Sequence, residues 1–315
     1  MDKIRLAVIG AGHLGTFHTK VYCAIQKKSG IDFIGVCDIR RKTAKEVAKK
    51  YGTNYFTDYH DLLDKVDAVS IVVPTSAHNI VARDFLKAGI HVLIEKPITK
   101  TIEEANELID LAEKKKLILQ VGHIEKFNSA VRAIEPLLST PKFIECQRLG
   151  SIKKKSRIKD VGVVLDLMIH DIDIILSLVN SKVKNIEAVG ISTVSKHEDL
   201  ANVRLTFQNN VIADITASRV TKEETRKIRI FQDQSYILLD YLHQEAFLFT
   251  GSATKKLHKE KIRIKKKEPL KVELRSFVDC VRHKKRPIVS GHEGRQALQV
   301  ALDILKKINT TPSHL

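Results

Sequence analysis

The strongest constraint on the fold is a short apolar run that ends directly in closely spaced glycines. Residues 4–9 (IRLAVI) are apolar apart from one arginine, and GAGHLG follows at 10–15. A run this short and this rich in branched side chains is typical of a buried strand. A helix-forming stretch begins at His13 and continues to about Lys28. The sequence therefore predicts a strand, a glycine turn and a helix, in that order.

Strand and helix patterns keep alternating as far as Gly122. After the first helix we expect strands at 33–37, near 55, and at 68–73, 91–94 and 118–121, with helices at 40–52, 59–63, 77–88 and 102–115. Continuous apolar strands separated by amphipathic helices indicate a doubly wound parallel sheet with helices on both faces. We therefore predict an α/β Rossmann domain over residues 1–122.

The pattern changes after Gly122. Helices are expected at 128–138, 163–178, 270–283 and 294–308, and extended segments at 142–148, 186–194, 201–207, 211–217, 227–231, 236–239 and 246–249. Asn209-Asn210 is a hairpin-turn signal between two of them. A run of strands bracketed by helices predicts an α+β domain with an open, mainly antiparallel sheet over residues 123–315. Because exposed strands of an open sheet usually find a partner, we expect a homodimer or homotetramer.

Composition excludes several classes of protein. No apolar stretch approaches the roughly 20 residues that cross a bilayer, and the first apolar run is too short for a signal peptide. We therefore expect a cytoplasmic protein without membrane association. The four cysteines are scattered, and Asp171 and Asp173 lack a nearby cluster of His and Cys residues at ligand spacing. Neither a disulfide framework nor a metal site is expected.

The charge distribution is lopsided. The formal net charge is +4 up to Gly122 and +13 after it, which suggests that the second part meets an anionic molecule. Solvated lysines explain most of this excess. There is no zinc finger, periodic basic helix or interleaving of aromatic and basic residues, so nucleic acid is not an expected partner.

The glycine turn has the neighbours that dinucleotide binding requires. Gly10 allows a tight turn, Gly12 lets a pyrophosphate approach the backbone, and Gly15 allows the helix to pack closely on the strand. The start of the helix, at His13 and Leu14, offers N–H groups and a partial positive charge to the phosphates. These five residues are predicted to bind the cofactor.

The acidic residue that ends the second strand bears on which cofactor binds. Asp38 can accept hydrogen bonds from the adenosine ribose and would repel a 2′-phosphate, which favours NAD over NADP. Arg40 and Arg41 follow it and could hold such a phosphate. NAD is the expected cofactor, with Asp38 and Arg40 among its contacts.

Two further motifs carry side chains suited to proton transfer. Glu95-Lys96-Pro97 ends a strand of the parallel sheet, at the edge where ligands bind in doubly wound folds. Asp166 and His170 are four residues apart in an apolar helix and are expected on one face. A carboxylate beside an imidazole raises its basicity, which suits a proton acceptor. An ion pair at a strand end and a satisfied core histidine are the alternative interpretations.

In this order and spacing, these motifs resemble the Gfo/Idh/MocA family of nicotinamide-dependent sugar oxidoreductases. The resemblance spans nearly the whole chain. It implies that Lys96 and His170 flank the substrate carbon facing the nicotinamide, with Asp166 beside them. It also implies a cis bond between Lys96 and Pro97. Further cofactor contacts implied by the family are Pro74, Thr75, His78, Glu95, Lys96 and Pro97.

Two segments narrow the resemblance. VGHIEKFN at 121–128 and DVGVVLDLMIHDIDI at 160–174 are most similar to the family's UDP-sugar 3-dehydrogenases. These oxidise C3 of UDP-N-acetylhexosamines such as UDP-N-acetylglucosamine, for instance towards the diamino sugars of lipid A. The resemblance implies substrate contacts by Glu125 and Asn128. The basic loop before the second segment suits an anionic nucleotide sugar, with Lys155 and Arg157 as contacts, or is simply solvated.

The motifs together predict NAD-dependent oxidation of a sugar secondary hydroxyl by hydride transfer. His170 would accept the hydroxyl proton, Lys96 would stabilise the developing alkoxide, and Asp166 would orient His170. The first two roles could be exchanged, because a partly desolvated lysine can also act as a base. The alternatives are a polyol or aldose dehydrogenase, as for inositol, and a non-catalytic dinucleotide-binding regulator. A nucleic-acid binder would rest only on the net charge.

Overall fold

The computed structural model describes residues 3–151, 161–252 and 255–310, and the chain divides into two compact units. The first comprises Met1–Ile124 and Glu268–Arg295, and the second comprises Glu125–Lys267 and Gln296–Leu315. Residues 268–295, which the sequence assigned to the second domain, thus belong to the first unit. The reason is α7 (Pro269–His283), whose buried Leu274 and Phe277 join the apolar core beneath α1 (His13–Ser29).

The first unit contains a six-stranded sheet in the order β3-β2-β1-β4-β5-β6, with every neighbouring pair parallel. Its strands are β1 (Ile4–Ile9), β2 (Ile31–Cys37), β3 (Asn54–Phe56), β4 (Ala68–Ile71), β5 (His91–Glu95) and β6 (Leu119–Gly122). This is the predicted doubly wound sheet. The strand order reverses between β1 and β4, and ligands of such folds bind beyond the carboxyl ends of the strands at that point.

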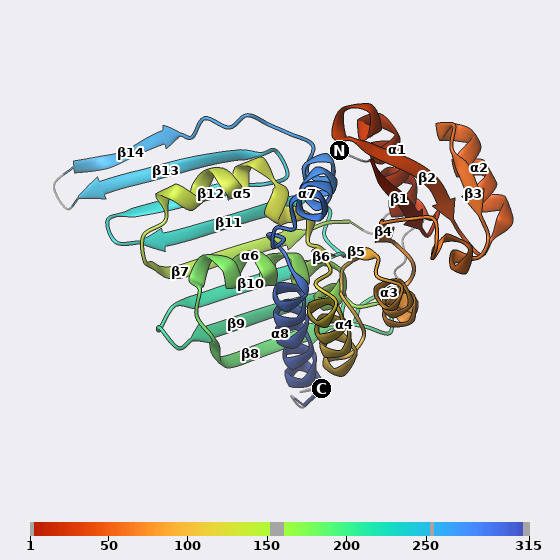
Figure 1. Ribbon diagram of the computed structural model, residues 1–315. Coiled ribbons are helices and arrows are strands. Elements are labelled where there is room, and N and C mark those ends of the chain that lie inside the picture. The colour runs from red at the N-terminus through yellow and green to blue at the C-terminus, as the bar shows by residue number, and fades with distance from the viewer. Residues whose placement is uncertain (1–2, 152–160, 253–254, 311–315) are drawn as a thin grey trace. The chain divides into compact units, whose positions relative to one another are not determined.

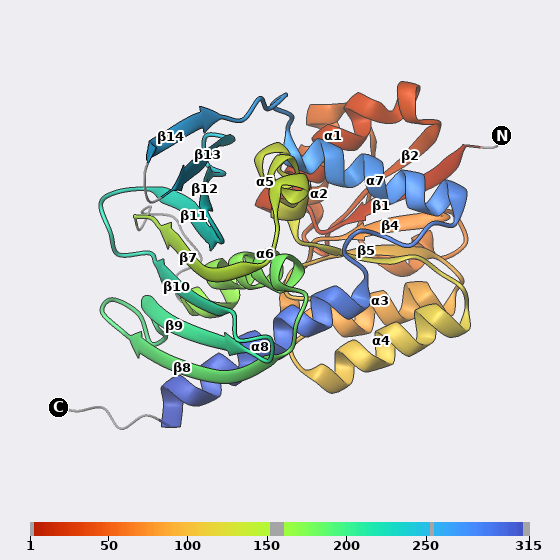
Figure 2. The same cartoon turned by 90° about the vertical axis from the view of Figure 1, so that its left-hand side faces the viewer.

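Helices cover both faces of this sheet (Figures 1 and 2). One layer holds α1, α2 (Arg41–Tyr51) and α7, and the other holds α3 (His78–Lys87) and α4 (Ile102–Lys114). Short 3-10 turns, η1 (Tyr59–Leu62) and η2 (Thr75–Ala77), follow β3 and β4. Lys27 and Lys28 lie in the last turn of α1, and Lys49 and Lys50 lie in the last turn of α2, where positive charges interact favourably with the helix dipole.

The second unit contains an eight-stranded sheet in the order β14-β13-β12-β11-β7-β10-β9-β8. Its strands are β7 (Pro141–Leu149), β8 (Val183–Ile191), β9 (Leu200–Phe207), β10 (Ile212–Ser218), β11 (Thr225–Gln232), β12 (Ser235–Asp240), β13 (Glu245–Ser252) and β14 (Lys255–Lys261). All neighbouring pairs are antiparallel except β7 with β10. The predicted open, mainly antiparallel sheet is confirmed, including the hairpin turn at Asn210, which has a φ of 63°.

Helices cover one face of this second sheet (Figure 1). They are η3 (Ile124–Phe127), α5 (Ser129–Ile134), η4 (Glu135–Leu137), η5 (Val164–Met168), α6 (Ile169–Val179) and α8 (Gly291–Thr310). Inward-facing residues of the strands alternate with outward-facing ones, as in β7, where Ile144 and Cys146 are buried. Apolar side chains of α5, α6 and α8 complete this core.

Three elements differ from the sequence prediction. β14 was not expected, because its sequence KKLHKEK is dominated by lysine and shows little apolar alternation. The helix expected over 128–138 is a single α-helical turn and a half that passes into a 3-10 turn at Glu135-Pro136. The long helix expected over 163–178 begins with a π-helical turn, η5, before α6. A single π turn within a helix cannot be recognised from the spacing of apolar residues.

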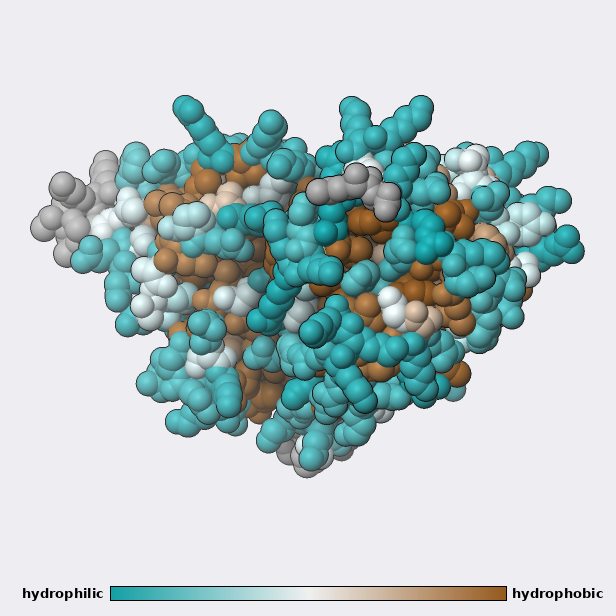
Figure 3. All heavy atoms as spheres, in the orientation of Figure 1, coloured by the Kyte–Doolittle hydropathy of each residue, from teal (hydrophilic) through white to brown (hydrophobic). Residues whose placement is uncertain are grey.

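Hydrophilic side chains cover much of the surface seen in Figure 3, as expected for a chain with a formal net charge of +17. Within the described residues, none of the helices combines the length and the apolar character needed to cross a membrane.

Candidate active site

The glycine turn lies where the strand order of the first sheet reverses. Gly10 has a φ of 104°, and a Cβ on it would lie 2.5 Å from the carbonyl oxygen of Val72, just after β4. A Cβ on Gly15 would overlap the carbonyl oxygen of Gly10. By contrast, a Cβ on Gly12 would meet nothing within 4 Å. The fold itself therefore requires Gly10 and Gly15, whereas Gly12 keeps space open beside the start of α1.

The first turn of α1 is suited to an anion. Gly12 occupies the N-cap position without a side-chain hydrogen bond, and no acidic residue lies in the first turn. His13 is exposed, with its ring edge-on to Phe17, and Leu14 is partly buried. The uncapped N–H groups and the positive end of the helix dipole thus meet at the space that Gly12 leaves open.

Asp38 ties the end of β2 to the glycine turn. Its Oδ2 accepts a hydrogen bond of 2.9 Å from the Ala11 N–H, and its Oδ1 accepts one of 2.9 Å from the Arg40 N–H. The Arg40 guanidinium also reaches Oδ1 at 3.2 Å. Burial opposes ionisation of Asp38, but these donors outweigh it and hold its pKa below the usual range. Asp38 therefore presents a fixed, charged carboxylate beside the turn.

The predicted Glu95-Lys96-Pro97 motif ends β5, and its Lys96–Pro97 bond is cis, as the family resemblance implied. Glu95 Oε1 lies 3.1 Å from Nε2 of His18, which is fully buried in α1. A Cβ on Gly122 would lie 2.9 Å from the Glu95 carboxylate carbon. Burial opposes ionisation of Glu95, but His18 and Lys96 outweigh it and lower its pKa. Glu95 is therefore held by the protein itself, directly before Lys96.

His78 fastens the turn that follows Lys96. Its Nδ1 lies 2.9 Å from the carbonyl oxygen of Pro97, and its Nε2 lies 3.0 Å from that of Val73. The side chain is 1% exposed, and burial lowers its pKa. Nearby, Pro74 is exposed and Thr75 is partly buried. His78 thus bridges the segments that directly follow β4 and β5. The cofactor contacts predicted for His78, Pro74 and Thr75 stay predictions.

Asp166 and His170 lie at the junction between η5 and α6. Asp166 is within the π turn and is exposed, and His170 is the second residue of α6 and is partly buried. π turns are rare and occur frequently at functional sites. The sequence predicted an uninterrupted helix here, so the π turn is a feature of the candidate site that the sequence did not reveal.

A buried charged network surrounds Asp171, the residue after His170. Arg148 on β7 donates two hydrogen bonds to the Asp171 carboxylate, from Nε at 2.8 Å and from Nη2 at 3.0 Å. The hydroxyl of Tyr241 also donates to Asp171, and the Arg148 guanidinium lies 5.1 Å from the Tyr241 ring centre. Asp171 is fully buried, and Arg148 and Tyr241 are 5% and 3% exposed.

Two predicted substrate contacts belong to the same network. Glu125 Oε1 accepts hydrogen bonds of 3.3 Å from Arg148, and Asn128 donates to Glu125 Oε2 at 3.3 Å and to the Tyr241 carbonyl oxygen at 2.9 Å. The Asn128 side-chain oxygen accepts from the Ala130 N–H at the start of α5. Both residues thus have buried structural partners, and their substrate contacts stay predictions. Lys155 and Arg157 lie outside the described residues.

The sequence predictions did not include Arg148, His18 or Tyr241, and only Arg148 carries a local sequence signal. Arg148 falls on the inward face of β7, two residues beyond buried Cys146, and a charge at an inward position indicates a buried partner. His18, which contacts Glu95, and Tyr241 carry no local signal, because their partners are 77 and 70 residues away.

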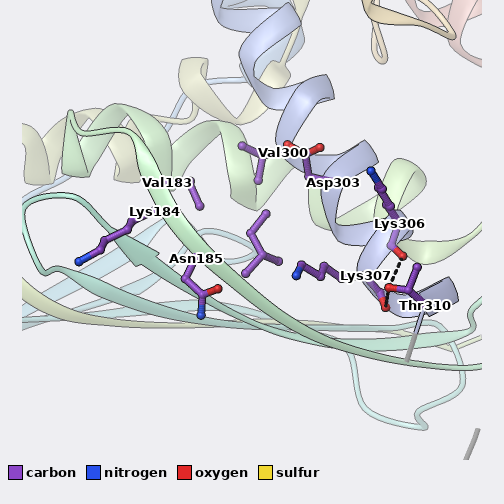
Figure 4. Close-up of a pocket in the computed structure, with 9 residues that line it drawn as sticks. Val183, Lys184, Asn185, Val300, Asp303, Lys306, Lys307 and Thr310 are labelled. Atoms are coloured by element: carbon purple, nitrogen blue, oxygen red, sulfur yellow. Dashed lines mark hydrogen bonds between the residues drawn. The ribbon is translucent and has the colours of Figure 1, made fainter. Parts of the chain in front are cut away.

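No group of three or more His, Cys, Asp or Glu side chains in the described part of the chain is arranged to hold a metal ion. A separate cavity of about 430 Å³ lies between β8 and α8 in the second unit (Figure 4). Its lining includes Lys184, Asp303 and Lys306 but none of the predicted site residues.

The residues of the first unit fit a nicotinamide dinucleotide. The space beside Gly12 and the uncapped start of α1 would hold the pyrophosphate, and the fixed carboxylate of Asp38 would receive the adenosine ribose. Two family descriptions match the chain. "Oxidoreductase family, NAD-binding Rossmann fold" matches residues 4–123, and "GFO/IDH/MocA C-terminal domain" matches residues 141–237.

The chain belongs to the GFO/IDH/MocA family of oxidoreductases. It is similar to UDP-N-acetylglucosamine 3-dehydrogenase of Acidithiobacillus ferrooxidans, with 35% identity over 310 residues, which cover 96% of this chain and 97% of that protein. A solved structure of that name and organism matches with a TM-score of 0.91 over 98% of both chains. The predicted resemblance is confirmed.

More distant relatives and solved structures differ in the substrates that they are named for. The scyllo-inositol 2-dehydrogenase (NAD(+)) of Bacillus subtilis is 24% identical over 324 residues, covering 95% of this chain and 92% of that protein. Levoglucosan dehydrogenase, solved in complex with NADH and L-sorbose, is 17% identical with a TM-score of 0.85, over 98% of this chain and 97% of that one. At these identities the likeness of structure shows a common fold.

Proposed function

We propose that the protein oxidises a secondary hydroxyl of a sugar, with C3 of a UDP-N-acetylhexosamine as the reacting carbon and NAD⁺ as the acceptor. The observation that carries this proposal is the 35% identity to a UDP-N-acetylglucosamine 3-dehydrogenase, which extends over 96% of this chain. The family matches, over residues 4–123 and 141–237, include both the cofactor turn and the segment around His170. A 3-keto sugar is a suitable substrate for amination, the step expected on the way to diamino sugars.

Each of three site residues has one role in the proposed reaction. The nicotinamide ring supplies the hydride acceptor when the cofactor is bound. His170 accepts the proton of the reacting hydroxyl, and Asp166 orients its imidazole. Lys96 donates a hydrogen bond to the same oxygen and stabilises the negative charge that develops there. The carbon thus loses a hydride and its oxygen loses a proton, which leaves a ketone.

The cofactor preference follows from Asp38. Its carboxylate is held beside the glycine turn by the Ala11 N–H and by Arg40, so its charge cannot swing away from a bound ribose. A 2′-phosphate would lie near this carboxylate, which is largely shielded from water. We expect their repulsion to outweigh the attraction between the phosphate and the exposed Arg40 side chain. NAD is therefore the proposed cofactor.

We also propose that the protein forms a homo-oligomer. A row of aromatic rings crosses four neighbouring strands, with adjacent ring centroids 4.3 to 5.8 Å apart: Phe143 on β7, Phe231 on β11, Tyr236 on β12 and Phe249 on β13. They alternate with the buried residues of those strands and so lie on the sheet face away from α5 and α6. A second copy would cover this partly exposed aromatic face. Light scattering of the purified protein tests this, and a monomer at micromolar concentration contradicts it.

A second candidate is a dehydrogenase of free polyols, favoured by the relatives named for inositol oxidation. The test is a panel of UDP-N-acetylglucosamine, UDP-glucose, scyllo-inositol and myo-inositol, each with NAD⁺ and with NADP⁺. Absorbance of the reduced nicotinamide reports turnover. Reduction with UDP-N-acetylglucosamine and NAD⁺ supports the proposal, whereas turnover confined to the inositols replaces it with the second candidate.

A further inference from the structure

A π turn within a helix is a rare conformation, and rare backbone conformations persist only where the surrounding structure holds them. In this protein the π turn η5 carries Asp166, and His170 follows in the first turn of α6. The geometry of the proposed proton-transfer pair therefore depends on what fixes the chain before the π turn and after His170.

The chain before the π turn is fastened by Glu198. Its backbone oxygen accepts a hydrogen bond of 3.0 Å from the Val163 N–H, and its Oε1 accepts one of 3.0 Å from the Val164 N–H. Gly162 makes room for this carboxylate, because a Cβ on Gly162 would overlap it. Glu198 is 8% exposed. One acidic side chain thus satisfies a backbone donor at the first residue of η5.

The chain after His170 is fastened by Asp171. Its two carboxylate oxygens receive the bidentate hydrogen bonds of Arg148 and the hydroxyl of Tyr241. Asp171 is fully buried, so any displacement of α6 would leave a charge without its partners in a region closed to water. This contact resists both rotation and translation of the first turn of α6.

A buried ion pair of this kind adds little stability over apolar packing, because removing the charges from water offsets much of their attraction. Its geometric effect is larger, since a planar guanidinium bound through two donors accepts one orientation of the carboxylate. Glu125 holds the same guanidinium from another direction at 3.3 Å. The network therefore specifies a position more than it supplies stability.

We propose that Glu198, Arg148 and Tyr241 are positioning residues, which clamp the π turn from both ends and thereby fix His170 in the geometry for proton transfer. This inference rests on the proposed function of His170. None of the three needs to touch the substrate or the cofactor.

The test compares variants that loosen one end of the clamp with matched controls. Tyr241→Phe and Glu198→Ala should each lower kcat about 10-fold, because displacements well below 1 Å have effects of this order, while the KM for NAD⁺ stays unchanged. Glu198→Gln keeps an oxygen acceptor for the Val164 N–H and should restore most of kcat. Arg148→Lys keeps the charge but loses the second hydrogen bond to Asp171. It should lower kcat at least as much as Tyr241→Phe does.

Tyr22→Phe is the matched control for Tyr241→Phe. Tyr22 is fully buried in the first unit, and its hydroxyl lies 2.8 Å from Ser70 Oγ. Both variants lose a buried hydroxyl contact and should lower Tm by a few degrees. Only Tyr241→Phe should lower kcat.

A second measurement does not depend on catalysis. The imidazole resonances of the 13 histidines can be followed by NMR in the protein without ligand, with His170→Asn identifying the signal of His170. Tyr241→Phe and Glu198→Ala should shift or broaden this signal, whereas Tyr22→Phe should not. If the wild-type protein oxidises no sugar, the proposed function fails and the NMR comparison still decides the clamp. An unchanged His170 signal together with an unchanged kcat in both variants overturns the proposal.

Discussion

The glycine turn after β1 and the π turn before α6 are held in place in opposite ways. The glycine turn is shaped mainly by its own residues, since Gly10 and Gly15 allow backbone approaches that no side chain would permit, and Asp38 adds a hydrogen bond from the end of β2. The π turn is held by side chains from distant parts of the chain, with Glu198 34 residues from its contact at Val164 and Tyr241 70 residues from Asp171. The conformation of the proposed binding turn is thus encoded largely by its own sequence, whereas the position of the proposed proton acceptor is encoded by the folded domain.

The largest expected effect concerns the residue that we assign to the reacting oxygen. Lys96→Ala should lower turnover about 10²- to 10³-fold, the usual effect of removing a donor to a developing oxyanion. Affinity for NAD⁺, measured by calorimetric titration, should fall far less than turnover, because the glycine turn and Asp38 stay intact. Lys96→Met controls for loss of volume and should be equally slow. Full activity in Lys96→Ala would exclude the proposed role.

Two glycine substitutions sharpen the description of the turn. Gly12→Ala places a methyl group in open space, so the free energy of unfolding of the ligand-free protein should change by less than about 1 kcal/mol. The same methyl group would occupy the proposed pyrophosphate position, and affinity for NAD⁺ should fall by at least about 10-fold.

Gly15→Ala is the counterpart, since its methyl group would overlap the Gly10 carbonyl oxygen. It should destabilise the ligand-free protein by about 3 kcal/mol, measured by urea unfolding. If instead the Gly12→Ala protein binds NAD⁺ with unchanged affinity, the pyrophosphate does not bind beside Gly12.

How far the sequence predicts the structure follows the same division. The parallel sheet, the cis bond at Lys96–Pro97 and the glycine turn were all readable, because apolar runs, glycines and a family motif mark them locally. The placement of α7 in the first unit could not be predicted from the sequence, because an apolar helix face does not indicate which of two domains it packs against. The π turn and the contact of Asp171 with Arg148 depend on tertiary packing that no local pattern records.

A smaller effect is expected at Asp38. Asp38→Asn keeps an oxygen acceptor for the Ala11 N–H but removes the charge. The ratio of the Kd values for NADP⁺ and NAD⁺ should fall about 10-fold, equivalent to about 1.4 kcal/mol. Arg40→Gln is the informative partner, because it should move this ratio in the opposite direction. An unchanged ratio of Kd values in Asp38→Asn would show that the Asp38 charge does not determine the preference for NAD⁺ over NADP⁺.

The smallest expected effect is on stability in acid. Burial opposes ionisation of Asp199, but the N–H of Val194 and the Arg219 side chain, at 2.8 Å, outweigh it and hold the pKa of Asp199 well below its usual range. A depressed pKa stabilises the folded state above the unfolded-state value of about 3.9, and this contribution is lost as the pH falls further. Urea unfolding between pH 6 and pH 2.5 should therefore show a shallower loss of stability in Asp199→Asn. An equal slope in both proteins would contradict the assignment.

The central claim is that the glycine turn, Lys96 and His170 serve one dehydrogenation. The most direct measurement is the rate of NAD⁺ reduction with UDP-N-acetylglucosamine by the wild-type protein and by Lys96→Ala and His170→Asn. We expect turnover in the wild type, retained NAD⁺ binding in both variants, and a loss of turnover of about 10²-fold or more in each. Wild-type turnover that survives in either variant would contradict this claim.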